Sequence, residues 1–317
     1  MGLDKKYRPK VLDNVIGQNS VVKTLKTKFN NNTLPHAMIF HGPSGVGKTT
    51  LARVVASLLD APDVLEIDGA SYTGVDDMRD IANYLKYPSL QGNKRKFLIL
   101  DEAHMLSKNA WNSWLKMIEE PPEHVYFAFC TTEYGRVIET IKTRCTVFKL
   151  NPIKASEIEA CIKNIILTEG INLEERFISK IVTESKGSLR QAIVLLEQIM
   201  DVPVEEIDNV LNTAIERDEV TMLCRYIVDD VTNLDYKLFV QNINTVSHID
   251  PESLRALIIG YMTQCIFKTE KATLYNAEWM YFMLNCMLET DPRTMGGVIS
   301  GLLKIYFDKI KRILSKK

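Results

Sequence analysis

The 317-residue chain lacks several features that would mark particular classes of protein. Its six cysteines form no Cys-x-x-Cys pair and no spacing typical of a zinc module, which argues against a zinc site and a disulfide framework and for a reducing cytoplasm. No apolar run approaches the ~20 residues of a membrane span, and the polar, basic first ten residues do not resemble a signal peptide. The formal net charge of −1 gives no global argument for nucleic-acid binding, so any DNA contact must come from local groups of residues.

The most informative stretch that is present follows a short apolar run at 37–41 and precedes a segment with helical period. It reads Gly-Pro-Ser-Gly-Val-Gly-Lys-Thr-Thr and matches the phosphate-binding pattern G-x-x-x-x-G-K-T, whose context is a strand, a loop and a helix. Glycines let backbone amides curl around phosphate oxygens, and the helix N-terminus faces the anion. We expect a nucleoside triphosphate to be bound by the loop residues Gly42, Pro43, Ser44, Gly45, Val46, Gly47, Lys48, Thr49 and Thr50.

Four side chains carry the chemistry expected at this site. Lys48 would reach the β- and γ-phosphates, and the Thr49 hydroxyl would be a Mg²⁺ ligand. The apolar run 97–100 ends in two carboxylates, of which Asp101 would help to hold Mg²⁺ and Glu102 would polarise the attacking water. The sequence indicates no metal other than Mg²⁺.

The expected secondary structure divides the chain into three parts. Strands are expected at 37–41, 64–67, 97–100, 125–130 and 146–150, with helices between them at 18–28, 48–60, 74–87, 107–120 and 136–142. Alternation of this kind is typical of a doubly wound α/β domain with a parallel sheet, here residues 1–151. Only helices are expected beyond it, in a small domain at 152–215 and a larger one at 216–317, with one helix after Pro203 and the next at 218–230.

Three smaller features have structural interpretations. Ser107 is the expected N-cap of the helix that follows it. The helical stripe Trp111, Trp114, Leu115 and Ile118 is expected to pack on the sheet rather than to contact a partner. The basic residues Lys304, Lys309, Lys311, Arg312, Lys316 and Lys317 are expected to form the solvent-exposed face of a last helix.

Two arginines and a threonine are further candidates for the site. Arg144 follows a short helix, and Arg190 opens a helix of the small domain. Either arginine could stabilise a transferring phosphoryl group, in its own chain or in a neighbouring one, or could be an ordinary surface residue. Thr132 follows the run 125–130 and could place its hydroxyl near the γ-phosphate, or could simply end a strand.

Taken together, these residues show that the chain resembles the AAA+ clamp-loader ATPases, a family that includes the gamma/tau subunits of bacterial DNA polymerase III and the small subunits of replication factor C. The likeness runs from residue 6 to about residue 200. It is carried by Lys6-Tyr7-Arg8-Pro9, Val15-Ile16-Gly17-Gln18, the phosphate loop, Asp101-Glu102, Glu119-Glu120-Pro121-Pro122, Thr131-Thr132, Thr143-Arg144-Cys145 and Gly187-Ser188-Leu189-Arg190. The resemblance implies a P-loop AAA+ domain, a helical lid domain and a C-terminal helical collar domain.

The resemblance also implies roles for individual residues. The adenine would be surrounded by Tyr7, Arg8, Pro9, Val15 and Ile16. Arg190 would sense the γ-phosphate in its own subunit and Thr132 would be the first sensor. Arg144 would be a finger that completes the site of a neighbouring subunit. The residues expected to contact DNA are Thr73, Gly74 and Arg79, in a segment where the family usually carries a basic residue or two.

The function implied by the resemblance is that of an ATPase subunit of a DNA polymerase clamp loader, with ATP and Mg²⁺ as cofactors. Such a subunit uses ATP to open a sliding clamp and load it on primer–template DNA during replication. Its partners would be the clamp, the other subunits of a pentameric ring, the DNA polymerase and the DNA backbone, without any membrane. The family's four-cysteine zinc module is absent, which suggests a phage-encoded form acting in the cytoplasm of a bacterium or of a phage-infected host.

Two alternatives stay open. The chain could be another AAA+ motor that acts on DNA, such as a helicase loader or a branch-migration ATPase, or a scaffold subunit of the loader that does not hydrolyse ATP. Asp101-Glu102-Ala103-His104 also spells the box of one helicase class. Those helicases have two sheet domains, whereas only one is expected here.

Overall fold

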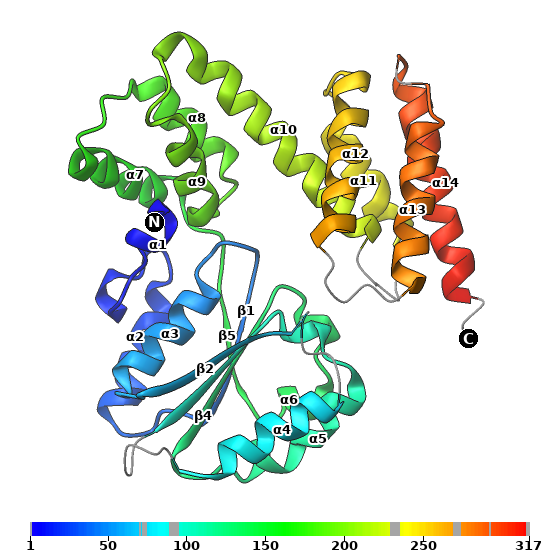
Figure 1. The fold of residues 1–317 in the computed structure, drawn as a ribbon. Helices are drawn as coiled ribbons and strands as arrows, with labels where there is room; N and C mark the ends of the chain where they lie inside the picture. The colour runs from blue at the N-terminus through cyan, green and yellow to red at the C-terminus, as the bar shows by residue number, and fades with distance from the viewer. Residues whose placement is uncertain are drawn as a thin grey trace. The chain divides into compact units, whose positions relative to one another are not determined.

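The computed structural model describes residues 2–69, 71, 75–88, 95–228, 235–268, 274–291 and 293–314. The chain forms two compact units, Met1–Val202 and Pro203–Lys317, whose helices and strands are drawn in Figure 1. The boundary expected at residues 215 and 216 falls inside a helix of the second unit. The division into three domains stays a prediction.

The first unit is built on a five-stranded parallel sheet with the strand order β2-β3-β4-β1-β5 (Figure 1). The strands are β1 (Ala37–His41), β2 (Asp63–Asp68), β3 (Lys96–Asp101), β4 (Val125–Thr131) and β5 (Thr146–Lys149). The three central strands are almost entirely buried because helices cover both faces of the sheet. The parallel α/β fold expected from the sequence is confirmed.

The edge strand β2 is less buried than the three central strands. Its side chains alternate between more and less exposed positions, and Val64 is 43% exposed. An edge strand has a neighbour on one side only, so fewer helices and strands cover its side chains.

Parallel strands place their C-terminal ends at one edge of the sheet, where ligands of such folds bind. Strand β1 leads there into the phosphate loop, β3 ends at Asp101 and β4 ends at Thr131. The register brings His41 opposite Thr131 and Asp68 opposite Asp101. The three segments that carry the predicted site residues therefore end close together.

The helices of the first unit are α1 (Leu3–Lys6), α2 (Asn19–Asn30), α3 (Lys48–Leu58), α4 (Val75–Lys86), α5 (Lys108–Glu119), α6 (Glu139–Lys142), α7 (Ala155–Glu169), α8 (Glu175–Glu184) and α9 (Leu189–Ile199). Three 3₁₀ turns are η1 (Leu12–Asn14), η2 (Ala103–Met105) and η3 (Tyr134–Arg136). Helices α2 and α3 pack into the apolar cluster on one face of the sheet, and α4 and α5 into the cluster on the other.

Helix α5 shows how local sequence and packing agree. Its N-cap Ser107 accepts a hydrogen bond from the backbone N–H of Ala110 at 3.2 Å, as expected. Trp111 and Trp114 are buried, with ring centroids 5.1 and 6.3 Å from that of Phe129 on β4. The tryptophan stripe therefore packs on the sheet, as predicted.

Helices α7, α8 and α9 pack on one another, and α1 lies against α9 (Figure 1). Gly170 ends α7 in a left-handed conformation with φ of 68°, where a side chain would be strained. Ser188 caps α9 by accepting a hydrogen bond from the backbone N–H of Gln191 at 3.2 Å.

The described elements of the second unit are helices: α10 (Val204–Val228), α11 (Tyr236–Val246), α12 (Pro251–Lys268), α13 (Leu274–Leu288) and α14 (Met295–Leu314). The two helices predicted between Pro203 and residue 230 are wrong, because α10 is one helix of 25 residues. The stretch contains neither glycine nor proline, so nothing in it stops a helix. No described helix of the chain is both long and apolar enough to cross a membrane.

The face of α14 that was expected to be wholly exposed is not. Lys309 is 6% exposed, and its Nζ donates a hydrogen bond to the carbonyl of Ile227 at 2.6 Å. Ile227 lies in the last turn of α10, where carbonyls lack partners within the helix and attract cations. Lys304 is exposed as predicted and pairs with Glu289 at 3.2 Å. The side chains of Arg312, Lys316 and Lys317 lie outside the described part of the chain.

Candidate nucleotide-binding site

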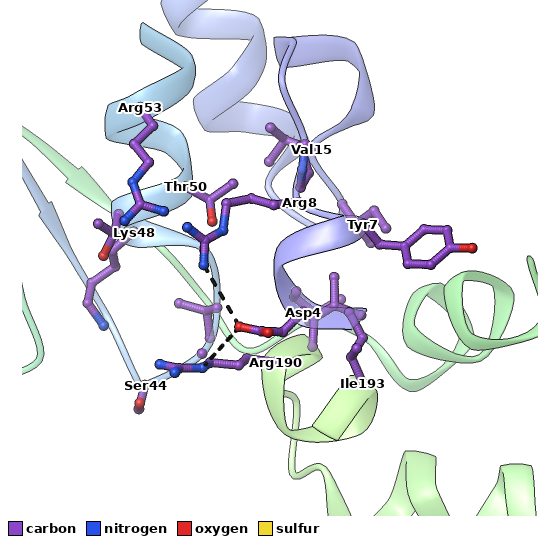
Figure 2. A pocket seen from close by; sticks show the side chains of 18 of the residues that line it. Asp4, Tyr7, Arg8, Val15, Ser44, Lys48, Thr50, Arg53, Arg190 and Ile193 are labelled. Atoms are coloured by element: carbon purple, nitrogen blue, oxygen red, sulfur yellow. Dashed lines mark ion pairs between the residues drawn. The ribbon is translucent and has the colours of Figure 1, made fainter. Parts of the chain in front are cut away.

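A cavity of about 310 Å³ is lined by the phosphate loop and by segments far from it in the sequence (Figure 2). The predicted site residues that line it are Tyr7, Arg8, Pro9, Val15, Ile16, Ser44, Gly45, Val46, Gly47, Lys48, Thr49, Thr50, Asp101, Glu102 and Arg190. They come from the N-terminal segment, the start of α3, the end of β3 and the start of α9. All of these segments belong to the first unit.

The glycines of the phosphate loop have conformations that other residues rarely adopt. Gly45 has φ of 72° and Gly47, the N-cap of α3, has φ of 102°. A Cβ at residue 45 would lie 1.9 Å from the Ser188 Oγ of the α9 cap, so the loop and that helix touch without space for a side chain. Left-handed glycines turn consecutive amides toward one side of the loop, as an anion site requires.

Lys48 is buried at the base of the loop, with 6% of its surface exposed. Its Nζ donates hydrogen bonds to the carbonyls of Gly42 at 2.9 Å and Pro43 at 2.7 Å. Burial lowers the pKa of Lys48, and the nearby carboxylates of Glu102 and Asp101 partly oppose that shift. Gly42 and Pro43 are not among the residues that line the cavity. Their role here is to hold the ammonium group.

The side chains expected to hold Mg²⁺ meet directly. The Thr49 hydroxyl donates a hydrogen bond to Asp101 Oδ2 at 2.8 Å. A hydroxyl and a carboxylate are hard oxygen ligands of the kind that Mg²⁺ prefers. Their contact beside the phosphate loop therefore fits a Mg²⁺ ion bound together with phosphates.

Glu102 has an unusual backbone. Its φ of 45° is left-handed, a conformation that non-glycine residues adopt mostly where the surrounding structure requires it. Its side chain is 40% exposed, and Oε2 accepts a hydrogen bond from the Thr132 hydroxyl at 3.2 Å. Thr132 does not line the cavity itself but contacts the carboxylate that does. The arrangement holds the carboxylate at the wall of the cavity, where it is able to accept a proton.

A histidine that sequence reasoning did not assign to the site supports this carboxylate. Buried His104 places Nδ1 at 3.0 Å from Thr131 Oγ1 and at 3.4 Å from Glu102 Oε2. Its Nε2 lies 3.2 Å from Glu133 Oε1. The only sequence signal was the resemblance of residues 101–104 to a helicase box. His104 thus connects Glu102 with the end of β4.

The two candidate arginines lie in different surroundings. Arg190 lines the cavity, its Nε lies 3.9 Å from Asp4 Oδ2, and its backbone N–H donates to the Gly45 carbonyl at 3.4 Å (Figure 2). Arg144 is not among the residues that line the cavity. Its guanidinium donates to the Thr140 carbonyl at 2.9 Å and lies 3.3 Å from Glu119 Oε1.

Six residues that line the cavity were not predicted: Asp4, Lys5, Arg53, Ile153, Leu189 and Ile193. Arg53 lies one helical turn after Thr49, so the i, i+4 spacing on α3 could have found it. Its Nε donates to Glu66 Oε2 at 2.7 Å. The spacing of Leu189 and Ile193 offered the same signal on α9. Nothing in the local sequence marked Asp4 or Lys5, because only the folded chain brings them to the loop.

The remaining predicted residues concern DNA and adenine. Thr73 and Gly74 lie outside the described residues, whereas Arg79 is exposed on α4, 3.1 Å from Asp76 Oδ1. The hydroxyl of Tyr7 donates to Glu169 Oε1, and Figure 2 shows the Tyr7 ring directed away from the labelled cavity residues. The described part of the chain contains no cluster of three or more His, Cys, Asp or Glu side chains that could hold a metal ion.

Comparison with known proteins gives relatives that are gamma or tau subunits of DNA polymerase III. The chain is 35% identical over 291 residues to a DNA polymerase III subunit gamma of Buchnera aphidicola, which covers 83% of this chain and 77% of that protein. A second Buchnera gamma subunit is 36% identical over 61% of its own length. The tau subunit of Escherichia coli is 34% identical, and the match covers 62% of this chain and 34% of that protein. This chain thus spans about a third of the E. coli relative.

A family model described as DNA polymerase III, delta subunit, matches residues 59–154. Among solved structures, the RuvB Holliday junction branch migration motor of Thermotoga maritima is similar with a TM-score of 0.52 and 21% identity, over 94% of this chain and 90% of that one. A RuvB mutant of the same organism gives a TM-score of 0.54 at 23% identity, over 69% of this chain and 79% of that one. Similarity at this level of identity shows a shared AAA+ fold.

Proposed function

Since the chain belongs to the family of DNA polymerase III gamma and tau subunits, we propose that it is an ATP-hydrolysing subunit of a clamp loader that acts in DNA replication. The observation that carries the proposal is that the expected phosphate-binding, metal-binding and general-base residues meet around one cavity. Lys48 is buried under the phosphate loop, the Thr49 hydroxyl donates to Asp101, and the Glu102 carboxylate accepts a hydrogen bond from Thr132.

The phosphates of ATP would be bound by the amides of the phosphate loop, with Lys48 beside them. Thr49 and Asp101 would hold Mg²⁺, which when bound neutralises charge on the phosphate oxygens. Glu102 would accept a hydrogen bond from the attacking water and withdraw its proton. Thr132 and His104 would keep that carboxylate in place, since both contact its Oε2.

The arginines support an assembly of several subunits. Arg190 lies at the cavity of its own chain and would contact the γ-phosphate there. Arg144 is directed to Thr140 and Glu119 and would act in the cavity of a neighbouring subunit. A finger arginine supplied in trans makes hydrolysis depend on assembly, which is what a loading cycle needs.

The partners follow from this proposal. A clamp loader would contact a sliding clamp, its other subunits, the polymerase and primer–template DNA. Arg79 near the start of α4 is the described residue assigned to DNA phosphates, a contact that carries no sequence information.

A non-hydrolysing scaffold subunit and a branch-migration motor each account for fewer of these observations than a clamp-loader ATPase does. A scaffold subunit that does not hydrolyse ATP would not need Lys48, Thr49, Asp101 and Glu102 all in place. The likeness to RuvB concerns the fold at 21–23% identity, whereas the two Buchnera gamma subunits described above are 35% and 36% identical. The gamma relatives therefore favour the clamp loader over a branch-migration motor.

The test is steady-state ATP turnover of the purified protein, alone and with primer–template DNA, its sliding clamp and partner subunits. We expect strong stimulation that requires both the clamp and primed DNA, and loss of turnover in Glu102→Gln with ATP binding retained. Turnover driven by branched DNA and indifferent to the clamp would support a branch-migration motor instead. Absence of turnover under every condition would support the scaffold.

A further inference from the structure

The N-terminal segment is held against the helices that follow the sheet by contacts on both sides of Asp4. The backbone N–H of Leu3 donates to Glu197 Oε1 on α9 at 3.1 Å. On the other side, Lys6 Nζ lies 2.7 Å from Glu169 Oε1, and Tyr7 donates its hydroxyl to the same oxygen. These contacts lower the pKa of Glu169, first through its bond with Lys6. Asp4 therefore lies in a segment fixed at both ends.

The Asp4 carboxylate lies between Arg8 and Arg190, two of the three arginines that line the cavity (Figure 2). One oxygen, Oδ2, is 3.9 Å from Arg8 Nη2 and 3.9 Å from Arg190 Nε. The Asp4 side chain is 16% exposed and that of Arg190 is 72% exposed. The carboxylate is thus the fixed member of the pair, and the long arginine side chain is the one with freedom to move.

The base of Arg190 is already at the phosphate loop. Its backbone N–H donates to Gly45 O at 3.4 Å, and a Cβ at Gly45 would lie 3.4 Å from the Arg190 Cβ. Rotation of side-chain torsions alone can therefore carry the guanidinium from Asp4 toward phosphates bound by the loop. Such rotation of exposed side chains is fast and needs no movement of the backbone.

A carboxylate in a cavity for a polyphosphate works against the ligand unless cations neutralise it. The two arginines supply that neutralisation in the absence of nucleotide. A γ-phosphate would compete with Asp4 for Arg190, because both are anions that suit a guanidinium. A nucleoside diphosphate has no γ-phosphate with which to draw Arg190 away.

We propose that Asp4 is a specificity-determining residue that retains Arg190 in the absence of a γ-phosphate and thereby sets the relative affinity for nucleoside triphosphate and diphosphate. The proposal rests on the assignment of the cavity as the ATP site. Part of the triphosphate's binding energy is used to separate Arg190 from Asp4. Diphosphate leaves this ion pair intact.

The test measures the affinities of a non-hydrolysable ATP analogue and of ADP, both with Mg²⁺, for the full chain and its variants. In Asp4→Asn we expect affinity for the ATP analogue to rise by about three- to fivefold and affinity for ADP by less than about twofold, as the loss of one partly exposed ion pair allows. Asp4→Glu keeps the charge and should stay close to wild type.

Arg190 provides the decisive control. In the Arg190→Ala background, Asp4→Asn should no longer change the ratio of the two affinities. Asp13→Asn removes the same charge from the N-terminal segment at a residue that does not line the cavity, and should leave both affinities unchanged. Circular dichroism and the melting temperature verify that each variant is folded.

The outcomes separate this inference from the proposed function. If the wild-type chain binds no nucleotide, the ATP site itself is wrong. If it binds nucleotide but Asp4→Asn equals wild type, or has a lower affinity for the ATP analogue, Asp4 does not compete with phosphate. Asp4→Asn could also raise the affinities for the ATP analogue and for ADP equally, or raise the affinity for the ATP analogue in the Arg190→Ala background as well. Either result would show a general effect of charge and overturn the inference.

Discussion

The surroundings of Arg190 and Arg144 differ in a way that their sequence contexts do not reveal. Arg190 lines the cavity, stands next to the phosphate loop through its own backbone and pairs there with Asp4. Arg144 does not line the cavity and is bound to the Thr140 carbonyl and Glu119. One chain thus brings one of the two arginines to its own site. We expect the other, Arg144, to act on the nucleotide of a different molecule, and the variants below test this.

The groups at the base of the cavity make the contrast sharper. Lys48, Thr49 and Asp101 all find their hydrogen-bond partners within a few residues of the phosphate loop and the end of β3. Their geometry needs no second chain. Binding of nucleotide should therefore be a property of the single chain, whereas full hydrolysis should be a property of an assembly.

The largest effect expected is that of Lys48→Ala, which should abolish ATP binding or turnover because the loop loses its only lysine. Turnover should fall below detection in the isolated chain and in the assembly alike. Direct titration with labelled ATP and a steady-state turnover assay measure this. Normal turnover in the variant would show that this cavity is not the ATP site. The roles assigned to Arg190 and Arg144 would then have no basis.

The next effect is that of Arg144→Ala, which tests the comparison itself. A finger supplied in trans contributes roughly 10³–10⁵ in rate, so turnover of the assembled ring should fall by about that range. Nucleotide affinity and the basal turnover of the isolated chain should stay nearly unchanged. Arg176→Ala, which removes an exposed arginine paired with Glu174 on α8, is the matched control. An equal loss in the monomer would mean that Arg144 acts within its own chain.

A smaller effect is expected at His104, which contacts Glu102 but not the cavity. His104→Ala should lower turnover roughly 10- to 100-fold by loosening the carboxylate, with little change in nucleotide affinity. His124, whose Nε2 lies 3.2 Å from the Leu85 carbonyl, is a control histidine remote from Glu102. The diagnostic result is a fall in ATP turnover of His104→Ala without a matching fall in its nucleotide affinity. A change in affinity alone would contradict the positioning role.

The smallest effect concerns pH. Burial lowers the pKa of Lys48 in the free chain, and bound phosphates would raise it again because they favour the ammonium form. Protonated Lys48 is the form that binds phosphate, so ATP affinity should decline as pH rises through the lowered pKa, with proton uptake on binding at that pH. Lys48→Arg, if it binds, should lack this decline since arginine stays charged. An alkaline series of titrations would show a flat profile if the lysine does not face the phosphates.

Much of the fold follows from local sequence patterns. The apolar runs, the phosphate loop and the Ser107 cap are short-range signals, and all reappear at their expected positions. The contact between Thr49 and Asp101 also follows, because parallel strands bring their ends to one edge of the sheet.

What could not be predicted depends on distant parts of the chain. Asp4 is an isolated acid in a polar segment, and only the packing of α1 on α9 brings it between two arginines. Lys309 follows the amphipathic pattern of an exposed face, yet the carbonyl of Ile227 gives it a buried partner. The continuity of α10 could have been inferred, since the stretch from 204 to 228 has no breaking residue.

The close approach of Gly45 to Ser188 has a consequence for how this sequence can vary. A Cβ at position 45 would lie 1.9 Å from the Ser188 hydroxyl, and the φ of 72° at Gly45 opposes any larger residue. A smaller residue at position 188 would relieve the clash, but it would remove the cap of α9 and leave the backbone strain at position 45. Glycine is therefore expected at position 45 whatever residue stands at position 188. A library that randomises the phosphate loop should recover functional chains only with glycine retained there, even where α9 is varied with it.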